Sequence, residues 1–321
     1  MRIIFRADAS REIGSGHVMR SSMLAEEAVS RGHECIFIGQ IDDLSWVESY
    51  VSQLGYTRIF RSEDQYVPNK KTDTLVLDSY SINPSSRFVS RDMWKQIVCI
   101  SDLLTPSYNS DIELRPGFFS GYEGEAGKWV LTGPEHVLVR KGTKKSIRIE
   151  RSGLPLKVLI VGGGSDPFGF VEAICRLLPD LNLALEIHVF GDRVFTDSKF
   201  CVFITHPSGV SLDLVAEGVD VVLSTASTLS LEFIARELPC GIVCAVNNQK
   251  ELYEQLAELS YAIPIGGLDS NGAWHFNLEN LMRLLSILEV RDGIRTAISG
   301  LVDLKGPSRV LDKIERHNSL N

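Results

Sequence analysis

The feature that most constrains the fold is the alternation of short apolar runs with segments of helical period. In the first half, runs of strand length lie at 2–8, 34–39, 56–60, 74–80, 96–102 and 136–140. Between them, apolar residues recur every three to four positions, which predicts helices, among them 17–31, 44–55 and 85–95. Parallel strands need such crossovers, so we predict an α/β fold with a doubly wound parallel sheet.

The same alternation restarts after a basic, polar stretch that has neither period and is typical of a linker. We therefore predict an N-terminal Rossmann-like domain at 1–145, a linker at 146–154, and a C-terminal Rossmann-like domain with terminal helices at 155–321. Sheets of this kind bind ligands at the carboxyl ends of their strands, so we expect the two domains to face a central cleft. Further strands are expected at 157–161, 184–192, 199–206, 219–225 and 240–246.

Composition excludes several classes of function. The net charge of −8 argues against a general nucleic-acid binder, although an acidic protein can hold a local site for a small anion. No apolar run is long enough to span a bilayer, and we recognise no signal peptide, so we expect a cytoplasmic protein. The six cysteines are scattered, and Cys240 with Cys244 is a weak metal motif, so we expect reduced thiols and no metal. The sequence is compatible with a monomer and leaves the oligomeric state open.

The segment REIGSGHVMR, residues 11–20, places two glycines and a histidine where the first strand gives way to a helix. Gly14 and Gly16 permit a tight turn and the close approach of a ligand. His17 opens the helix, whose positive end disfavours imidazolium and so suits a general base. Asp8, at the end of the strand, could orient the ring. The alternative is that the glycines only make a turn and that His17 is a capping or solvated residue.

Other polar side chains also follow predicted strands in this domain. Asp78 and Tyr80 end one strand, and Asp102 ends another. Because the carboxyl ends of parallel strands share one edge of a sheet, we expect these side chains to face the same cleft as His17.

In the second domain, GGGSDP at 162–167 follows a strand and precedes a helix. Glycines allow close approach of a ligand, and a helix N-terminus offers N–H groups to an anion. The alternative is a tight turn in which Asp166 caps the helix. The loop lacks the GK[ST] of a P-loop and the GxGxxG of a dinucleotide fingerprint, so no nicotinamide cofactor is indicated.

A second loop, STAST at 224–228, offers hydroxyls from Ser227 and Thr228 that can donate to a diphosphate. Glu232, about a turn later, could accept both hydroxyls of a ribose; the alternative is favourable pairing with the helix N-terminus. Asn248 and Gln249 follow the next strand and could offer amides, or simply form a loop and cap.

One motif resembles a known family. FRADASREIGSGHVMR, at 5–20, is similar to the FR-x-D-x-S-x-x-IG-x-GH-x-x-R signature of the sugar-nucleotide hydrolases of pseudaminic acid synthesis. These enzymes hydrolyse UDP-2,4-diacetamido-2,4,6-trideoxy-β-L-altropyranose and are related to spore-coat polysaccharide and MurG-like glycosyltransferases with the GT-B fold. VLDSYSI at 76–82, GPEHVLVR at 133–140, GGGSDP and NNQ at 247–249 extend the resemblance over most of the chain.

The resemblance implies a GT-B-like fold and the hydrolysis of a UDP-sugar with inversion, without metal or cofactor. His17 would activate the water, with Asp8 supporting its loop and Tyr80 and Arg20 positioning sugar or phosphate. The remaining substrate-binding residues would be Gly14, Gly16 and Asp78 in the first domain, and Gly163, Gly164, Ser165, Ser227, Thr228, Glu232, Asn248 and Gln249 in the second.

The chain departs from the family at the second loop. Where the family has roughly GAGGSTSWE, this sequence has STASTLSLE: the glutamate aligns and the glycines do not. Side chains at those positions would crowd a phosphate. Two alternatives therefore stand beside the hydrolase: a GT-B glycosyltransferase that uses a nucleotide-sugar donor, and a non-catalytic nucleotide-sugar binding protein.

Overall fold

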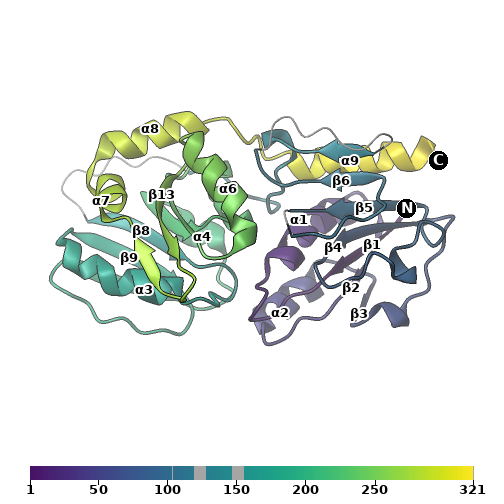
Figure 1. Ribbon diagram of the computed structural model, residues 1–321, viewed down its shortest axis with the longest axis horizontal. Helices are drawn as coiled ribbons and strands as arrows, with labels where there is room; N and C mark the ends of the chain where they lie inside the picture. Colours follow the sequence, from purple (N-terminus) through teal and green to yellow (C-terminus); the bar gives the residue numbers. More distant parts are fainter. Residues whose placement is uncertain (103, 119–127, 147–154, 321) are drawn as a thin grey trace. The chain divides into compact units, whose positions relative to one another are not determined.

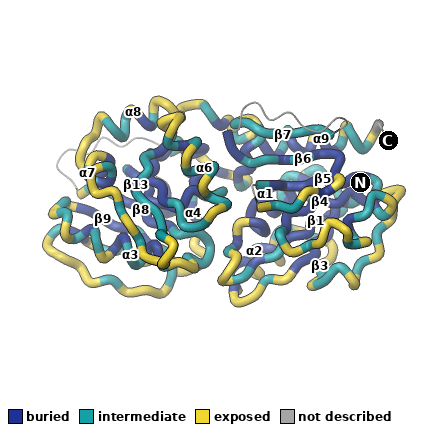
Figure 2. The backbone as a smooth tube through the Cα atoms, viewed as in Figure 1, coloured by how far each residue is buried: buried dark blue, intermediate teal, exposed yellow. Residues whose placement is uncertain are grey.

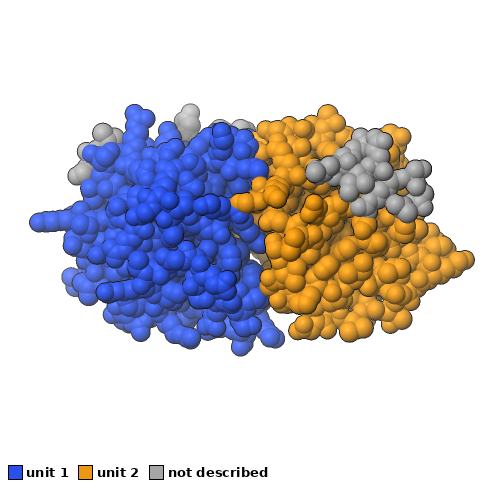
Figure 3. Space-filling model, turned by 180° about the vertical axis from the view of Figure 1, so that it is seen from behind, with its two compact units in different colours: residues 1–141, 303–321 blue, residues 142–302 orange. Residues whose placement is uncertain are grey.

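The computed structural model describes residues 1–102, 104–118, 128–146 and 155–320. The chain forms two compact units: Met1–Lys141 together with Asp303–Asn321, and Gly142–Val302 (Figure 3). Each unit is built on a seven-stranded sheet of its own. Most of the predicted linker, residues 147–154, lies outside the described residues. The second unit begins at Gly142, so residues 142–145, which were predicted in the first domain, belong to the second unit together with residue 146.

The sheet of the first unit is parallel throughout, in the order β3-β2-β1-β4-β5-β6-β7. The order reverses between β1 and β4, so the connections that leave these neighbouring strands turn to opposite sides and open space at their carboxyl ends. The strands are β1 (Arg2–Ala7), β2 (Glu34–Ile38), β3 (Arg58–Phe60), β4 (Asp73–Asp78), β5 (Gln96–Ile100), β6 (Ile112–Leu114) and β7 (Trp129–Leu131) (Figure 1).

The helices of this unit pack on one face of the sheet. Apolar residues of α1 (Gly16–Ser30), α2 (Ser45–Gln53) and α9 (Gly306–Leu320) share one core cluster with Phe5 and Phe37. The opposite face carries a second cluster, around Ile4, Leu75, Trp94 and Tyr108, covered by irregular chain and the 3₁₀ turns η1 (Glu63–Gln65) and η2 (Arg87–Val89). Figure 2 shows the central strands β1, β4 and β5 as the buried part of this unit.

Two expected elements of the first half are absent from the described residues. The predicted helix at 85–95 is replaced by η2 and loops, in which Trp94 is buried and donates from its ring to the carbonyl of Phe88. The predicted strand at 136–140 is irregular beyond the 3₁₀ turn η3 (Pro134–His136). Its apolar run reflects burial, because Val137, Leu138 and Val139 are all buried.

The C-terminal helix α9 was expected in the second domain, but it belongs to the first unit. Its apolar face joins the α1 side of the first core, and Arg31 at the end of α1 binds Asp312 at 2.6 Å and Glu315 at 3.0 Å. The chain therefore passes between the units twice, after Lys141 and after Val302.

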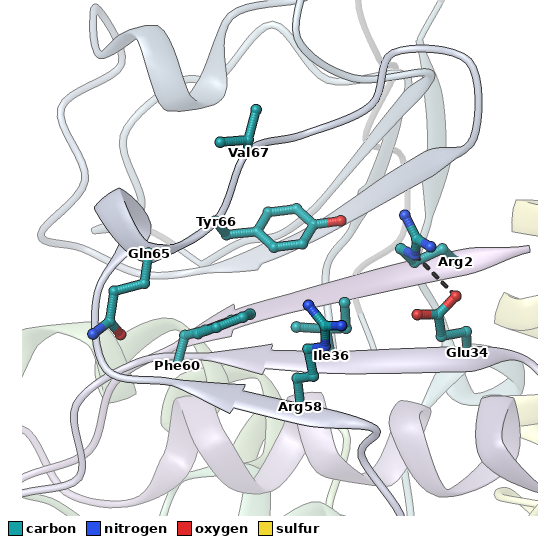
Figure 4. A pocket seen from close by; sticks show the side chains of 8 residues that line it. All are labelled: Arg2, Glu34, Ile36, Arg58, Phe60, Gln65, Tyr66 and Val67. Carbon is teal, nitrogen blue, oxygen red and sulfur yellow. Dashed lines mark hydrogen bonds and ion pairs between the residues drawn. The ribbon is translucent and has the colours of Figure 1, made fainter.

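A pocket of about 300 Å³ opens on the face of the first sheet opposite to α1, α2 and α9, near the amino ends of β1, β2 and β3 (Figure 4). Arg2 and Glu34, the first residues of β1 and β2, form an ion pair of 2.9 Å in its wall. The pocket is lined by Arg2, Glu34, Ile36, Arg58, Phe60, Gln65, Tyr66 and Val67. It lies at the end of the strands opposite to Asp78, the last residue of β4.

The second unit repeats this strand order as β10-β9-β8-β11-β12-β13-β14, with only the β13–β14 pair antiparallel in the described sheet. Its order reverses between β8 and β11. The strands are β8 (Leu156–Val161), β9 (Leu185–Phe190), β10 (Cys201–His206), β11 (Val221–Thr225), β12 (Cys240–Cys244), β13 (Ile263–Leu268) and β14 (Trp274–Phe276).

Helices connect and flank these strands (Figure 1). They are α3 (Phe170–Leu177), the 3₁₀ helix η4 (Leu178–Leu181), α4 (Leu212–Ala216), α5 (Thr228–Ala235), α6 (Asn247–Glu258), α7 (Leu278–Ser286) and α8 (Leu288–Ile298). Within the described ranges, no helix combines the length and the apolar character needed to cross a membrane.

Candidate active site

His17 is positioned by the loop that joins β1 to α1. The loop turns at Gly14, whose φ of +77° lies in the left-handed region that glycine adopts without strain. The helix begins at Gly16, so that His17 lies in its first turn and is only 6% exposed. Ser15 makes no side-chain cap and the first turn holds no acidic residue. The N-terminal N–H groups of α1 are therefore not capped by a side chain of the helix itself.

Asp78, the last residue of β4, binds both His17 and Arg20. Its Oδ1 lies 2.5 Å from His17 Nδ1 and accepts from Arg20 Nη2 at 2.7 Å, and its Oδ2 accepts from Arg20 Nε. With Nδ1–H donating to a carboxylate, the neutral ring carries its lone pair on Nε2, a tautomer inferred from this partner. Across the described residues, no hydrogen-bond partner is found for Nε2. The arrangement suits a base that takes a proton at Nε2.

The interaction between Asp78 and Arg20 keeps both side chains charged. Burial alone would raise the pKa of Asp78, but the charge of Arg20 and the hydrogen bonds from Arg20 and His17 outweigh it and hold the pKa below its usual value. Burial would lower the pKa of Arg20, whereas Asp78 and Asp102 raise it beyond its usual value. A buried guanidinium–carboxylate pair therefore stands beside the imidazole.

Asp102 and Tyr80 extend the arrangement to the next strand. Asp102 follows β5, and its Oδ2 lies 3.5 Å from Arg20 Nη1 and 3.4 Å from Nη2. The hydroxyl of Tyr80 donates to the same oxygen, and its ring meets the His17 ring edge to face, with centroids 4.3 Å apart. We call these five residues, His17, Arg20, Asp78, Tyr80 and Asp102, the His17 cluster.

Asp8, expected to orient the histidine, is held elsewhere. Its Oδ1 lies 2.7 Å from Arg6 Nη1 and accepts from the amide of Gln40 at 2.9 Å, and its Oδ2 accepts from Ser81 Oγ at 3.1 Å. The reason is strand parity: Arg6 and Asp8 share the face of β1 that α1 does not cover. The carboxylate that contacts His17 is Asp78, and Asp8 has a structural role in closing nearby loops.

In the second unit, the glycine loop after β8 is closed by Asp166. Its Oδ1 accepts from the amide of Phe170 at 2.9 Å and its Oδ2 from that of Val171 at 3.2 Å, so the carboxylate caps α3. A Cβ at Gly162 would lie 2.2 Å from Asp166 Oδ1, which explains the glycine there. The cap occupies these two amides, and the predicted binding residues Gly163, Gly164 and Ser165 are half-buried in the loop that it closes.

The loop after β11 is closed by Ser227, the residue before α5. Its hydroxyl accepts from the amide of Leu229 at 3.4 Å and lies 3.2 Å from Thr225 Oγ1, while Thr228 is the first residue of the helix. After the adjacent β12, Gln249 Oε1 accepts from the amide of Ala245 at 2.9 Å and closes the turn into α6. The small hydroxyl residues thus lie at the carboxyl edge next to the β8 loop, as expected, and Asn248 lies in the first turn of α6.

Glu232, expected to face a ribose, points inward. It is 1% exposed, and its Oε2 lies 3.5 Å from Nη1 of Arg236, which also binds Asp213 Oδ1 at 2.7 Å. The structure therefore places Glu232 in a buried ion pair with Arg236, which the partly exposed Asp213 extends, rather than at the surface beside Ser227. The i,i+4 spacing of Glu232 and Arg236 was the one feature of the sequence that could have predicted this pair.

The described residues contain no group of three or more His, Cys, Asp or Glu side chains arranged to hold a metal ion. Asp78 and Asp102, the two carboxylates of the His17 cluster, are instead engaged by Arg20 and Tyr80.

Comparisons with known proteins agree with this architecture. No family model matches the chain. It is 23% identical over 279 residues to the UDP-2,4-diacetamido-2,4,6-trideoxy-beta-L-altropyranose hydrolase of Campylobacter jejuni, covering 82% of this chain and 98% of the relative. Among solved structures it is similar to MurG of Acinetobacter baumannii (TM-score 0.64, 12% identity, 98% of this chain and 99% of the other). It is also similar to the spinosyn forosaminyltransferase SpnP (TM-score 0.63, 14% identity, 99% of each chain). The fold is a two-domain, GT-B-like fold, as the sequence predicts.

Proposed function

We propose that the protein is a nucleotide-sugar hydrolase that cleaves a UDP-sugar into UDP and the free sugar. The observation that carries this proposal is the His17 cluster: a buried imidazole whose Nδ1 is held by Asp78 while Nε2 has no hydrogen-bond partner in the described parts of the chain. The match to the Campylobacter hydrolase over most of both chains supports the same chemistry.

In the proposed reaction, His17 Nε2 takes a proton from a water molecule as the water oxygen attacks the anomeric carbon. The bond from that carbon to the diphosphate oxygen breaks, and UDP leaves with the electron pair. Attack opposite to the leaving group inverts the configuration. Asp78 keeps Nδ1 protonated and stabilises the imidazolium as it forms. UDP is a good leaving group, so the residues of the cluster need only supply the base.

The nucleotide is proposed to bind at the carboxyl edge of the second sheet. Gly163, Gly164 and Ser165 after β8, and Ser227 and Thr228 after β11, would contact the phosphates, with Asn248 nearby on α6. Small residues at this edge let a diphosphate approach the backbone closely. Substituting Thr228→Val is expected to weaken UDP binding severalfold without lowering kcat, because it removes one hydroxyl and no charge.

The test is acceptor-free turnover. UDP-sugars, including the diacetamido trideoxy-altrose one, are incubated with wild type, His17→Ala and the exposed-histidine control His275→Ala in the presence of EDTA. We expect UDP release by wild type and His275→Ala, and a loss of about 10²–10⁴-fold in His17→Ala. In H₂¹⁸O, the label should enter the sugar, because the sugar C–O bond breaks; label in the phosphate would contradict the mechanism.

A glycosyltransferase is the second candidate, favoured by the similarity to SpnP, whose name describes a sugar transfer. The same base could deprotonate an acceptor hydroxyl instead of water. Substrate that stays intact in water and turns over only when a sugar or lipid acceptor is added would establish transfer. Binding without turnover under both conditions would leave a non-catalytic nucleotide-sugar binding protein.

A further inference from the structure

We propose that Asp102 is a positioning residue for His17, which acts through Arg20 and Tyr80 to make protonation of the buried imidazole favourable. This inference rests on the proposed function, because it gives His17 the role of a base. Asp102 follows β5, which pairs with β4, and it reaches the cluster through its bonds to Arg20 and Tyr80. Its influence on His17 therefore passes through side chains.

The first connection is electrostatic. Arg20 Nη2 lies 3.2 Å from His17 Nδ1, so a buried cation stands next to the ring that must accept a proton. At this distance and in a buried site, such a cation opposes the formation of imidazolium. Asp78 balances the charge of Arg20, and Asp102, at 3.4 Å from Nη2, adds a second carboxylate.

The charge balance of the cluster follows from these contacts. With His17 and Tyr80 neutral, a guanidinium and two carboxylates leave a net charge of −1. Proton transfer to His17 brings the cluster to neutrality. Without the charge of Asp102, the same step would create a net positive charge among buried groups, which is costly. The negative charge of Asp102 thus offsets the positive charge that develops on His17 in the transition state.

The second connection is steric. Tyr80 donates its hydroxyl to Asp102 Oδ2 and sets its ring at 88° to the imidazole. The Tyr80 ring, packed with its centroid 4.3 Å from that of His17, limits rotation of the imidazole. The hydrogen bond from Tyr80 to Asp102 keeps the Tyr80 ring in this position. Asp102 also accepts from the amide of Leu104 at 3.1 Å, which fixes its own carboxylate.

Other charged groups near this edge have partners of their own. Asp8 pairs with Arg6 on the opposite side of β1, and Glu12 in the preceding loop accepts from Ser10 Oγ at 2.7 Å. Among the residues that the structure describes, the charged groups in contact with His17 are Asp78 and Arg20, and Asp102 contacts Arg20.

The experiment compares Asp102→Asn, Asp102→Glu and Tyr80→Phe with Asp42→Asn. Asp42 is an exposed carboxylate in the loop after β2, so its substitution removes the same charge at the same end of the sheet without touching the cluster. Two readouts are taken: kcat and KM for UDP-sugar hydrolysis across pH, and the midpoint at which the His17 ring gains its proton, followed by NMR on the full-length free protein.

For Asp102→Asn, we expect kcat to fall by about 10- to 100-fold with KM nearly unchanged. We also expect the acid limb of kcat/KM and the NMR midpoint of His17 to move to lower pH by about half a unit to one unit, because a nearby negative charge is lost. In Asp102→Glu, the NMR midpoint of His17 should return most of the way to the wild-type value. Tyr80→Phe should lower kcat and leave the midpoint close to that of wild type.

An NMR midpoint in Asp102→Asn that coincides with that of Asp42→Asn would overturn the inference. The NMR readout does not depend on turnover. A protein that shows the shifted midpoint but hydrolyses no UDP-sugar would refute the proposed function and leave the coupling of Asp102 to His17 established. If Asp102→Asn hydrolyses UDP-sugar but its midpoint is unshifted, the proposed function would stand and the coupling of Asp102 to His17 would be refuted.

Discussion

Replacing Asp78 by asparagine tests the centre of the His17 cluster. The substitution keeps the shape of the side chain but removes the charge, at a residue with no exposed surface. Asp78 accepts from His17 Nδ1 and from two nitrogens of Arg20. An amide has only one oxygen to accept these bonds, and its NH₂ group would face donors.

The cost to stability can be bounded from the contacts. Breaking a buried ion pair by removing one partner costs about 3–5 kcal/mol. Asp102 remains 3.4 Å from Arg20 Nη2 and offsets part of this cost. We therefore expect Asp78→Asn to lower the free energy of unfolding of the first unit by about 2–3 kcal/mol at pH 7. The loss of an oriented, protonated Nδ1 should lower kcat by about 10³–10⁴-fold.

The loss of stability should depend on pH in a defined direction. The pKa of Asp78 is lowered in the folded protein, so its stabilisation is fully present above the unfolded value of about 4 and is lost as the pH falls through the folded value. The difference between wild type and Asp78→Asn should be constant from about pH 5 to 8 and should narrow below about pH 4.

The assay combines urea unfolding, followed by tryptophan fluorescence, with kinetics of UDP release. Asp73→Asn is the matched control, because Asp73 is equally buried at the other end of β4 and accepts from the Tyr66 hydroxyl and the Asn69 amide. It should lose stability and keep its kcat. Unchanged kcat in Asp78→Asn, or equal losses of kcat in both variants, would refute the reasoning.

Three further outcomes are expected. Gly162→Ala should destabilise the second unit by about 1–2 kcal/mol in urea unfolding, because the new Cβ would lie 2.2 Å from Asp166 Oδ1 and displace the cap of α3. Glu232→Gln should leave UDP affinity within about twofold by calorimetry, since a buried side chain reaches no ribose; a loss above about tenfold would restore the ribose interpretation. The hydrogen bond from Arg309 lowers the pKa of Asp303 to about 2. Asp303→Asn should therefore lower the free energy of unfolding at pH 7 by about 0.5–1 kcal/mol, a modest value because the pair is partly exposed. That difference should fade between pH 4 and 2.

The period of the apolar residues was sufficient to predict the two sheets, because buried parallel strands are near-continuous apolar runs. It failed where burial occurs without regular structure. Val137, Leu138 and Val139 are all buried, so the segment resembles a strand although it is irregular. The three-residue strands β6 and β7 carry too short a pattern to be recognised.

The clustering of the polar side chains after β1, β4 and β5 was predicted, but their contacts were predicted only in part. The rule that parallel strands end at one edge placed His17 with Asp78, Tyr80 and Asp102. It could not say which carboxylate reaches the ring. Strand parity favours Asp78, because residue 8 shares a face with Arg6, away from α1. The inward turn of Glu232 depends on Asp213 from α4, a contact between distant segments that no local pattern contains.

The two units differ in what they place at the same topological position. Both sheets reverse their strand order between the first strand and its central neighbour, β1 with β4 and β8 with β11. The first reversal carries charged side chains that pair with one another around His17, an arrangement with a desolvation cost that well-packed apolar residues would avoid. The second carries glycines, serines and threonines, which cost little and let a ligand approach the backbone. The buried charges that could move a proton and the small residues that could admit a ligand are thus carried by different sheets of the chain.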